Sequence, residues 1–234
     1  MTASLATTTG SGPGHHLQAV LFDMDGTLVD TERNWFATET AVMADLGFTL
    51  GAHHAEHLLG SPMERAVAYL LSVSGLDIEP LELERRINTG MVEQLRTGVD
   101  LRPGAARLLA ELVHVGMPCA LVTASQRVIV DAVLPSIGAH HFRLTVAGDE
   151  VPRTKPHPDP YLAAARDLGA DPWACVVVED SPTGIASGES AGCAVLAVPS
   201  MTPIPPAAGR TVVESLETID VAFLRELARM RTAR

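Results

Sequence analysis

The feature that most constrains the fold of this chain is a set of short, continuous apolar runs that each end in polar side chains. Three are clear: QAVLFD at 18–23, PCALVTAS at 118–125 and ACVVVEDS at 174–181. CAVLAV at 193–198 is weaker, and FRLTVAG at 142–148 is a candidate for a fifth. Continuous apolar residues are typical of strands buried on both faces, as in a parallel sheet covered by helices. The runs therefore predict the strands of such a sheet.

Amphipathic helical patterns separate the apolar runs. GAARLLAELVHVG at 104–116 and PDPYLAAARDLGA at 158–170 each carry one apolar stripe and reach a glycine where the helix should end. SPTGIASGESAGC at 181–193 begins with Ser181 as a helix N-cap, and a last helix is expected within 214–231. This alternation of strands and helices predicts an α/β fold with a doubly wound parallel sheet and right-handed crossovers.

One long segment, residues 31–100, breaks the alternation. Its apolar residues repeat with helical periodicity, and it contains no convincing strand pattern. It is too long for an ordinary connection, so we interpret it as an inserted all-helical domain. The predicted organisation is a disordered tail at 1–16, a core built from 17–30 and 101–234, and the inserted helices between the two core segments.

The composition restricts the partners of the chain. Its 17 Lys and Arg against 28 Asp and Glu give a formal net charge of −11, which argues against nucleic acid or an anionic membrane surface. The three cysteines lie in apolar stretches without a C-x-x-C pattern, which favours free thiols in a reducing compartment. The first residues lack the pattern of a secretion signal. We expect a cytoplasmic protein, either a monomer or a weak homodimer, without a membrane partner.

Polar side chains occur in the sequence where the predicted strands end. Ligands of open α/β sheets bind beyond the carboxyl ends of the strands, so these side chains define the candidate site. A lysine in the loop before the helical pattern at 158–170 joins them. The set comprises Asp23, Asp25, Thr123, Ser125, Lys155, Glu179 and Asp180.

The four acids of this set need a cation beside them, because close carboxylates repel one another and raise each other's pKa. Mg²⁺ is the expected cofactor, since it prefers oxygen ligands. Lys155 and the backbone N–H groups of the turn at Gly26 and Thr27 would form a pocket for a phosphoryl group. Glycine lets the backbone curl close to phosphate oxygens. In this interpretation one of the paired acids, Asp23 and Asp25, attacks phosphorus while the other moves the proton.

Four motifs of the chain resemble those of the haloacid dehalogenase superfamily, in the expected order. They are DMDGTLVD at 23–30, LVTAS at 121–125, TKPHPDPY at 154–161 and VVVEDSPTGI at 176–185. Each motif alone has low specificity, whereas four in order at strand ends have high specificity. The resemblance covers residues 18–198 and implies a Rossmann-like core with a helical cap inserted after the first motif.

The resemblance also implies catalytic roles. Asp23 would be the nucleophile that forms an aspartyl-phosphate, and Asp25 the general acid and then the base for hydrolysis. Thr123 would donate to a phosphoryl oxygen, and Lys155 would steady the charge on Asp23 and the phosphate. An acid at Asp25 fits an oxygen leaving group, because the departing alkoxide must be protonated. The dehalogenases of the superfamily lack that second acid.

The metal site follows from the same resemblance. The implied Mg²⁺ ligands are Asp23, the backbone carbonyl of Asp25, Asp180 directly or through water, and Glu179 in an assisting position. Two simpler interpretations stay open. DMDG at 23–26 resembles the start of a calcium loop, which would need further acids at alternating positions. Glu179 and Asp180 could instead only cap the helix that follows them.

Substrate recognition is the least determined part of the prediction. The expected substrate contacts are Gly26, Thr27, Ser125 and Trp35. The start of the predicted cap, with Asp30, Glu32 and Trp35, is similar to that of hexose-phosphate phosphatases, including those that act on 2-deoxyglucose 6-phosphate. Two roles for Trp35 stay open, stacking on a sugar face and packing the hinge. A small phosphorylated metabolite is the expected partner.

The predicted function is Mg²⁺-dependent hydrolysis of a small phosphate monoester, with sugar phosphates as the leading candidates, through an aspartyl-phosphate. The alternatives are a β-phosphoglucomutase-type phosphotransferase, a phosphoglycolate phosphatase and, more distantly, a protein that binds phosphometabolites without turnover. Against the mutase, Met63 stands where such enzymes carry an arginine, although Arg65 lies near, and Trp35 stands where they carry a histidine. The motifs of the core are common to the mutases and the phosphatases and do not separate them.

Overall fold

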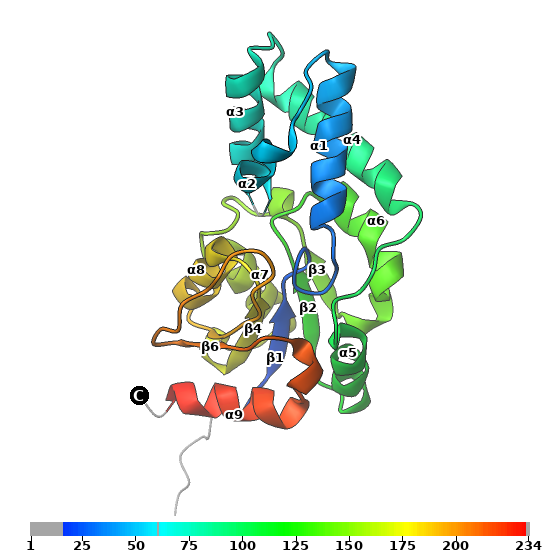
Figure 1. Cartoon of the computed structure of the whole chain (residues 1–234). Helices are drawn as coiled ribbons and strands as arrows, with labels where there is room; N and C mark the ends of the chain where they lie inside the picture. Colours follow the sequence, from blue (N-terminus) through cyan, green and yellow to red (C-terminus); the bar gives the residue numbers. More distant parts are fainter. Residues whose placement is uncertain (1–15, 60, 233–234) are drawn as a thin grey trace, which may run out of the picture.

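The computed structural model describes residues 16–59 and 61–232, so the predicted tail at 1–16 lies outside the described residues except for its last member. The centre of the described part is a six-stranded parallel sheet with the order β3-β2-β1-β4-β5-β6 (Figure 1). The strands are β1 Ala19–Phe22, β2 Cys119–Val122, β3 Leu144–Val146, β4 Cys175–Glu179, β5 Ala194–Ala197 and β6 Arg210–Val212. This order places a topological switch point between β1 and β4. The predicted Rossmann-like α/β fold is confirmed.

The central strands are buried on both faces, which explains their continuous apolar runs. In β1, Val20 and Phe22 face one apolar cluster, whereas Ala19 and Leu21 face another on the opposite side. Every residue of β2, β4 and β5 is also buried. Each such residue removes apolar surface from water at about 25 cal/mol per Å². The two clusters form the main core of the molecule.

Helices cover the two faces of the sheet. The helices are α5 Ala105–His114, α6 Arg127–Ile137, α7 Asp159–Leu168, α8 Pro182–Ser190 and α9 Val221–Thr232. Helices α5, α6 and α9 contribute to the first cluster, and α7 and α8 to the second. The predicted N-cap of α8 is present, because the Ser181 hydroxyl accepts a hydrogen bond of 3.1 Å from the N–H of Gly184.

Neither α6 nor β6 was predicted, and each has a physical reason. The α6 sequence RVIVDAVLPSI is rich in β-branched residues, which favour strands, and it contains Pro135. Strand β6 has only three residues, all partly exposed, at the edge of the sheet. Such a strand leaves no apolar run in the sequence.

Among the described residues between 32 and 95, four α-helices are present: α1 Glu32–Asp45, α2 Ala55–Leu58, α3 Met63–Ser74 and α4 Pro80–Leu95. Figure 1 shows this helical insertion beyond the carboxyl end of β1. It contains an apolar cluster of its own, to which Met43, Leu70 and Ile87 belong. The described helices agree with the helical periodicity of the sequence, while the division of the chain into core and cap domains stays a prediction.

The chain enters and leaves the helical insertion through two paired segments. The N–H of Asp30 donates to the carbonyl of Asp100 over 2.9 Å, and that of Arg102 to the carbonyl of Leu28 over 2.8 Å. Because these backbone hydrogen bonds join the segments before α1 and after α4, they fix where the insertion meets the sheet.

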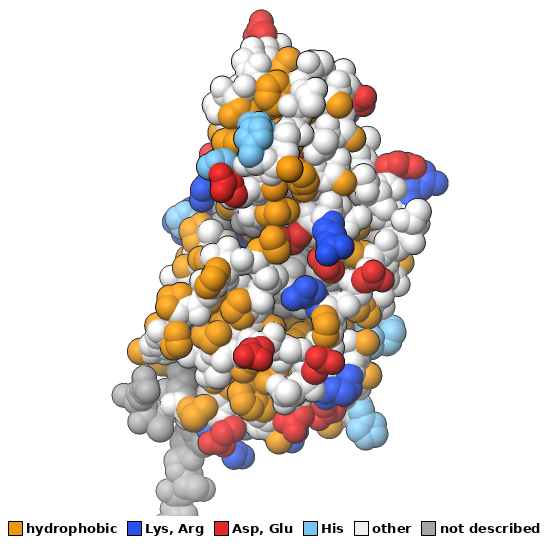
Figure 2. Space-filling view, viewed as in Figure 1, with side chains coloured by type: hydrophobic (Ala, Val, Ile, Leu, Met, Phe, Trp, Pro, Cys, Tyr) orange, Lys and Arg blue, Asp and Glu red, His pale blue; other side chains and the backbone are white. Residues whose placement is uncertain are grey.

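The remaining described residues form loops and short turns. Figure 2 shows acidic, basic and hydrophobic side chains interspersed over one face of the molecule. Within the described ranges, none of the helices combines the length and apolar character needed to cross a membrane. Short 3₁₀ helices occupy Ala52–His54, Ala139–His141, Gly148–Glu150, Pro172–Ala174 and Leu216–Thr218.

Candidate active site

The candidate active site lies where β1 and β4 end side by side. The two strands pair in parallel with Phe22 opposite Val178, so the residues that follow them come together. Asp23 comes directly after β1, and its N–H donates to the carbonyl of Val178 over 3.0 Å. Glu179 is the last residue of β4, and Asp180 follows it. The strand register therefore brings three of the predicted acids to one edge of the sheet.

Lys155 links two of these acids. Its Nζ lies 2.7 Å from Asp23 Oδ1 and 2.7 Å from Glu179 Oε1, and it also donates to the carbonyl of Val122 over 2.8 Å. The hydroxyl of Tyr161 donates to the same Glu179 oxygen over 2.8 Å. Burial alone would lower the pKa of Lys155, but the two carboxylates hold it above its usual value. The chain contains no other lysine, and this one is a buried cation between two acids.

When ionised, the three acids would carry more negative charge than Lys155 neutralises. Oxygens of Asp23, Glu179 and Asp180 lie within 4.8 Å of one another. Burial, followed by the charge of Glu179, raises the pKa of Asp23 to about 7 although Lys155 opposes the shift. Burial, followed by the charges of Asp23 and Glu179, raises the pKa of Asp180 well above its usual range. Close, buried carboxylates with raised pKa values fit a site for a divalent cation.

One carboxylate oxygen of this acid cluster has no hydrogen-bond partner among the described residues. It is Asp23 Oδ2, which is buried. A buried polar atom without a partner is costly, so an unpaired carboxylate oxygen points to a ligand. Because all the candidate donors are carboxylate oxygens, the residues fit Mg²⁺ better than a softer metal.

Asp25 lies beside the acid cluster, and its carboxyl group is held by hydrogen bonds from two segments. Its Oδ1 accepts from the Thr31 hydroxyl over 2.6 Å and from the Trp35 indole over 3.4 Å. Its Oδ2 accepts from the Ser125 hydroxyl over 2.7 Å and from that of Thr123 over 3.4 Å. The start of the helical insertion and the end of β2 thus orient one carboxyl group, which can transfer a proton without leaving its position.

Two glycines allow the backbone to approach the acids. Gly26 has φ +79°, and a Cβ there would lie 2.2 Å from Asp180 Oδ2. A Cβ on Gly184, in the first turn of α8, would lie 1.6 Å from Glu179 Oε1. Larger residues at these two positions would therefore displace the carboxylates. A residue with a side chain at position 26 would also be strained by the positive φ. Next to Gly26, the Thr27 hydroxyl lies 3.5 Å from Asp180 Oδ1.

All of the predicted site residues fall into two adjoining groups. Asp23, Lys155, Glu179 and Asp180 form one group, with Gly26 and Thr27 against Asp180. Asp25, Thr123, Ser125 and Trp35 form the other. Trp35 also packs against the apolar clusters of both the sheet and the helical insertion, so a hinge-packing contact is present. The catalytic and ligand roles of these residues stay predictions.

Several residues of the site were not assigned from the sequence. Tyr161 and Thr31 contact the acids as described above. The hydroxyl of Ser200, which follows β5, donates to Asp180 Oδ2, and its oxygen lies 3.4 Å from Glu32 Oε1. Tyr161 stands within the TKPHPDPY motif, and Ser200 lies just after an apolar run, so both left a weak signal. Nothing in the sequence indicates which acid each of them contacts.

Comparison with known proteins identifies relatives of the chain. The family model for haloacid dehalogenase-like hydrolases matches residues 20–198. Hexitol phosphatase A from Escherichia coli (strain K12) is 36% identical over 197 residues, which cover 78% of this chain and 84% of the relative. Fructose-1-phosphate phosphatase YqaB from the same organism is 32% identical over 177 residues, which cover 74% of this chain and 92% of the relative.

A solved structure is also similar. A CbbY variant from Rhodobacter sphaeroides in complex with xylulose-(1,5)bisphosphate superimposes with a TM-score of 0.80 at 27% identity, covering 89% of this chain and 99% of that one. Fold and site together define a Rossmann-like α/β protein with a buried acid cluster where β1 and β4 end. The chain belongs to the haloacid dehalogenase-like hydrolase family. The predictions of that family and of a phosphoric monoester hydrolase are confirmed.

Proposed function

We propose that this chain is a Mg²⁺-dependent phosphatase that hydrolyses a small phosphate monoester of a sugar or polyol, with Asp23 as the nucleophile. The observation that carries the proposal is the buried Lys155 between Asp23 and Glu179, with Asp23 Oδ2 unpartnered among the described residues. An unpaired carboxylate oxygen beside a fixed cation is suited to attack on phosphorus. The similarity to a hexitol phosphatase and a fructose-1-phosphate phosphatase supports a sugar or polyol ester.

In the first step, Asp23 Oδ2 forms a bond to phosphorus and the bond from phosphorus to the substrate's alcohol oxygen breaks. The Asp25 carboxyl group gives its proton to that leaving oxygen. The alcohol departs, and an aspartyl-phosphate remains on Asp23. Lys155, the Thr123 hydroxyl and the backbone N–H of Thr27 compensate the negative charge of the phosphoryl oxygens. The N–H of Gly26, also predicted for this task, instead donates to the carbonyl of Val29 over 2.8 Å.

In the second step, water attacks the phosphorus of the aspartyl-phosphate. The Asp25 carboxylate takes a proton from that water, inorganic phosphate leaves, and the Asp23 carboxylate is restored. The same carboxyl group therefore acts first as an acid and then as a base. Its short hydrogen bonds from Thr31 and Ser125 keep it in one place through both steps.

The Mg²⁺ ligands would be Asp23, through the oxygen that does not attack phosphorus, the backbone carbonyl of Asp25, and Asp180 directly or through water, with Glu179 in an assisting position. When bound, the ion supplies charge compensation for phosphoryl transfer. The hydroxyl groups of Ser200 and Thr27 contact Asp180 and orient it, as outer partners of metal ligands usually do.

The test is the release of inorganic phosphate from a panel of sugar, polyol and glycolate phosphates, with Mg²⁺ and with a chelator. We expect release from sugar or polyol esters that needs Mg²⁺. A preference for phosphoglycolate would replace the substrate class, and binding without release would replace the activity. Glucose 6-phosphate forming from β-glucose 1-phosphate much faster than free phosphate would establish the mutase alternative.

The cytoplasmic location and the monomer or weak dimer stay predictions.

A further inference from the structure

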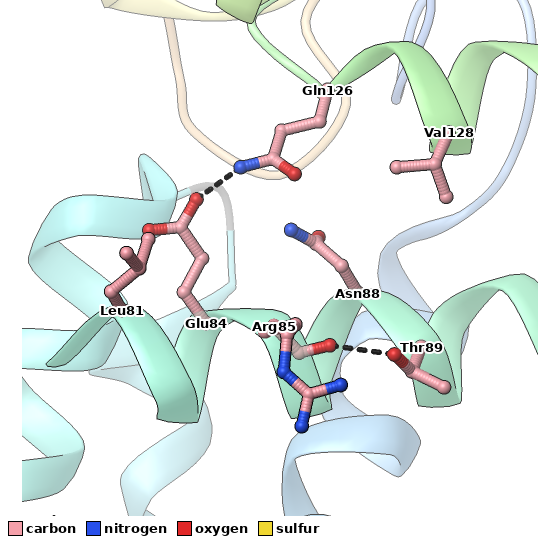
Figure 3. A pocket seen from close by; sticks show the side chains of 7 residues that line it. All are labelled: Leu81, Glu84, Arg85, Asn88, Thr89, Gln126 and Val128. Carbon is pink, nitrogen blue, oxygen red and sulfur yellow. Dashed lines mark hydrogen bonds between the residues drawn. The ribbon is translucent and has the colours of Figure 1, made fainter. Parts of the chain in front are cut away.

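A cavity of about 300 Å³ lies between helix α4 of the helical insertion and the start of α6 (Figure 3). We call it the seam pocket, because α4 forms one side and the start of α6 the other. Its volume is at the lower end of the range found for small-molecule sites, roughly 300–1,000 Å³. The lining residues are Leu81, Glu84, Arg85, Asn88, Thr89, Gln126 and Val128.

The seam pocket contains a buried amide that lacks a partner. Asn88 is 5% exposed, and its Nδ2 makes no hydrogen bond within the described part of the chain. Figure 3 shows the Asn88 amide directed from α4 into the space between Gln126 and Val128. An unpaired buried N–H group costs about 1–3 kcal/mol, and this cost is recovered when a ligand supplies an acceptor.

One wall residue of the seam pocket directly follows a residue of the candidate active site. Gln126, on its upper wall in Figure 3, directly follows Ser125, whose hydroxyl lies 2.7 Å from Asp25 Oδ2. A substrate with its phosphoryl group at Asp23 must extend its other end away from the sheet. The helical insertion lies on that side, and α4, which carries Asn88, is one of its helices.

The charges of the seam pocket favour an uncharged group over a second phosphate. The carboxylate of Glu84 lies on its wall and accepts a hydrogen bond from the Gln126 amide. The guanidinium of Arg85 is already bound to both oxygens of Glu82, over 2.9 and 3.0 Å. A hydroxyl group can accept from Asn88 Nδ2 and donate to a carboxylate or amide oxygen at once. An anionic group would instead face Glu84.

We propose that the seam pocket binds the uncharged, hydroxyl-bearing end of the substrate, with Asn88 as a specificity-determining residue. The enzyme then prefers monophosphates of sugars or polyols over bisphosphates. This inference rests on the proposed function, since it assigns the part of the same substrate that does not react.

Kinetics on two ester classes test the assignment. With fructose 1-phosphate, Asn88→Ala should lower kcat/KM roughly tenfold, the cost of one lost hydrogen bond. With p-nitrophenyl phosphate, which carries no hydroxyl for the pocket, kcat/KM should change less than about twofold. Asn88→Leu should show the same kinetic changes as Asn88→Ala on both esters. It should also keep the thermal stability of the native enzyme, because it removes an unpaired buried amide. The matched control is Gln94→Ala, an amide on the same helix outside the pocket, which should leave both rates unchanged.

A second pair of substrates tests the charge argument. Glu84→Gln should raise the rate with fructose 1,6-bisphosphate relative to fructose 1-phosphate several-fold, because it removes the negative charge from the wall. Equal losses on the sugar and aryl esters in Asn88→Ala, or no loss on either, would overturn the assignment. So would an unchanged bisphosphate ratio in Glu84→Gln.

Calorimetry separates this inference from the proposed function. In an Asp23→Asn background, adding Asn88→Ala should weaken the binding of fructose 1-phosphate roughly tenfold and leave that of inorganic phosphate unchanged. If the native enzyme releases no phosphate but this binding difference is found, the proposed function fails while the seam assignment stands. If phosphate is released and the binding difference is absent, the seam assignment fails alone.

Discussion

The carboxyl ends of β1 and β4 and the seam pocket each hold a buried polar atom without a partner among the described residues, but in opposite surroundings. Asp23 Oδ2 belongs to a residue fixed by Lys155 and crowded by two other acids. Asn88 Nδ2 faces a cavity between two helices that come from distant parts of the chain. In the proposed mechanism, the first arrangement fixes the reacting atom whatever alcohol is esterified. The second would contact only the alcohol part of the substrate.

The two proposals give separate tasks to the two regions. Catalysis needs atoms held in place before the substrate arrives, and a parallel sheet edge with ion pairs supplies that rigidity. Selection needs contacts that differ between substrates, and the seam pocket is built from side chains of α4 and α6. Substitutions at the sheet edge should therefore lower the turnover of all esters to a similar extent. Substitutions at the seam pocket should lower the turnover of some esters more than that of others.

Among the changes that leave Asp23 in place, the largest effect is expected from Lys155→Met. Asp23 and Glu179 would then lie buried without their shared cation, which should lower the free energy of unfolding by roughly 3–5 kcal/mol. Turnover should fall by at least about a hundredfold with aryl and sugar esters alike, because the charge compensation is lost. Chemical denaturation and phosphate release measure the two effects.

A second substitution controls for misfolding. Adding Glu179→Gln to Lys155→Met removes one of the uncompensated charges and should restore part of the stability but not the turnover. If Lys155→Met lowered the rate for sugar esters only, the division of tasks between the two regions would be wrong.

A smaller effect is expected from exchanging Mg²⁺ for Ca²⁺. Ca²⁺ accepts more oxygen ligands at longer distances and often binds both oxygens of a carboxylate. It would then occupy the Asp23 oxygen that must attack phosphorus. We expect Ca²⁺ to support little turnover and to inhibit in the presence of Mg²⁺, equally for aryl and sugar esters. Similar rates with both ions would contradict the role given to Asp23 Oδ2.

The smallest effect concerns a buried acid of the helical insertion. Glu39 on α1 is 4% exposed, and burial raises its pKa from 4.5 to about 7. The folded protein therefore holds this proton more tightly than the unfolded chain. Stability should rise as the pH falls from about 7 towards 4.5, and the ionised carboxylate should cost up to about 3 kcal/mol above pH 7.

Glu39→Gln isolates this contribution. The variant should be more stable than the native chain at pH 8, and the difference should shrink by pH 5, as followed by thermal unfolding at both values. Turnover should change little, which separates Glu39 from the acids at the sheet edge. A stability difference that is independent of pH would show that Glu39 is not buried as a charge.

The sequence predicted the sheet edge better than the seam. Asp23, Asp25, Glu179 and Asp180 follow continuous apolar runs, and burial on both faces produces such runs directly. The strand register then brings their side chains together. Strand β6 was missed because an exposed edge strand needs no apolar run.

The seam could not be predicted in the same way. Asn88 lies in a helix with ordinary amphipathic periodicity, and nothing in that pattern marks one amide as unpaired. The contact between Glu84 and Gln126 joins residues 42 positions apart, through two helices of which one was not predicted. Pairings of this kind depend on how the helical insertion docks on the sheet.

The most direct test of the account asks whether Asp23 carries the phosphoryl group. The native enzyme would be mixed with Mg²⁺ and a sugar phosphate that it hydrolyses, quenched rapidly in acid, and digested for mass spectrometry. We expect a phosphoryl group on the peptide that contains Asp23, removed by hydroxylamine and missing with chelator. The Asp23→Asn variant should stay folded, remain unlabelled and lose several orders of magnitude in turnover. Near-native turnover in that variant, or a phosphoryl group on a different residue, would contradict the account.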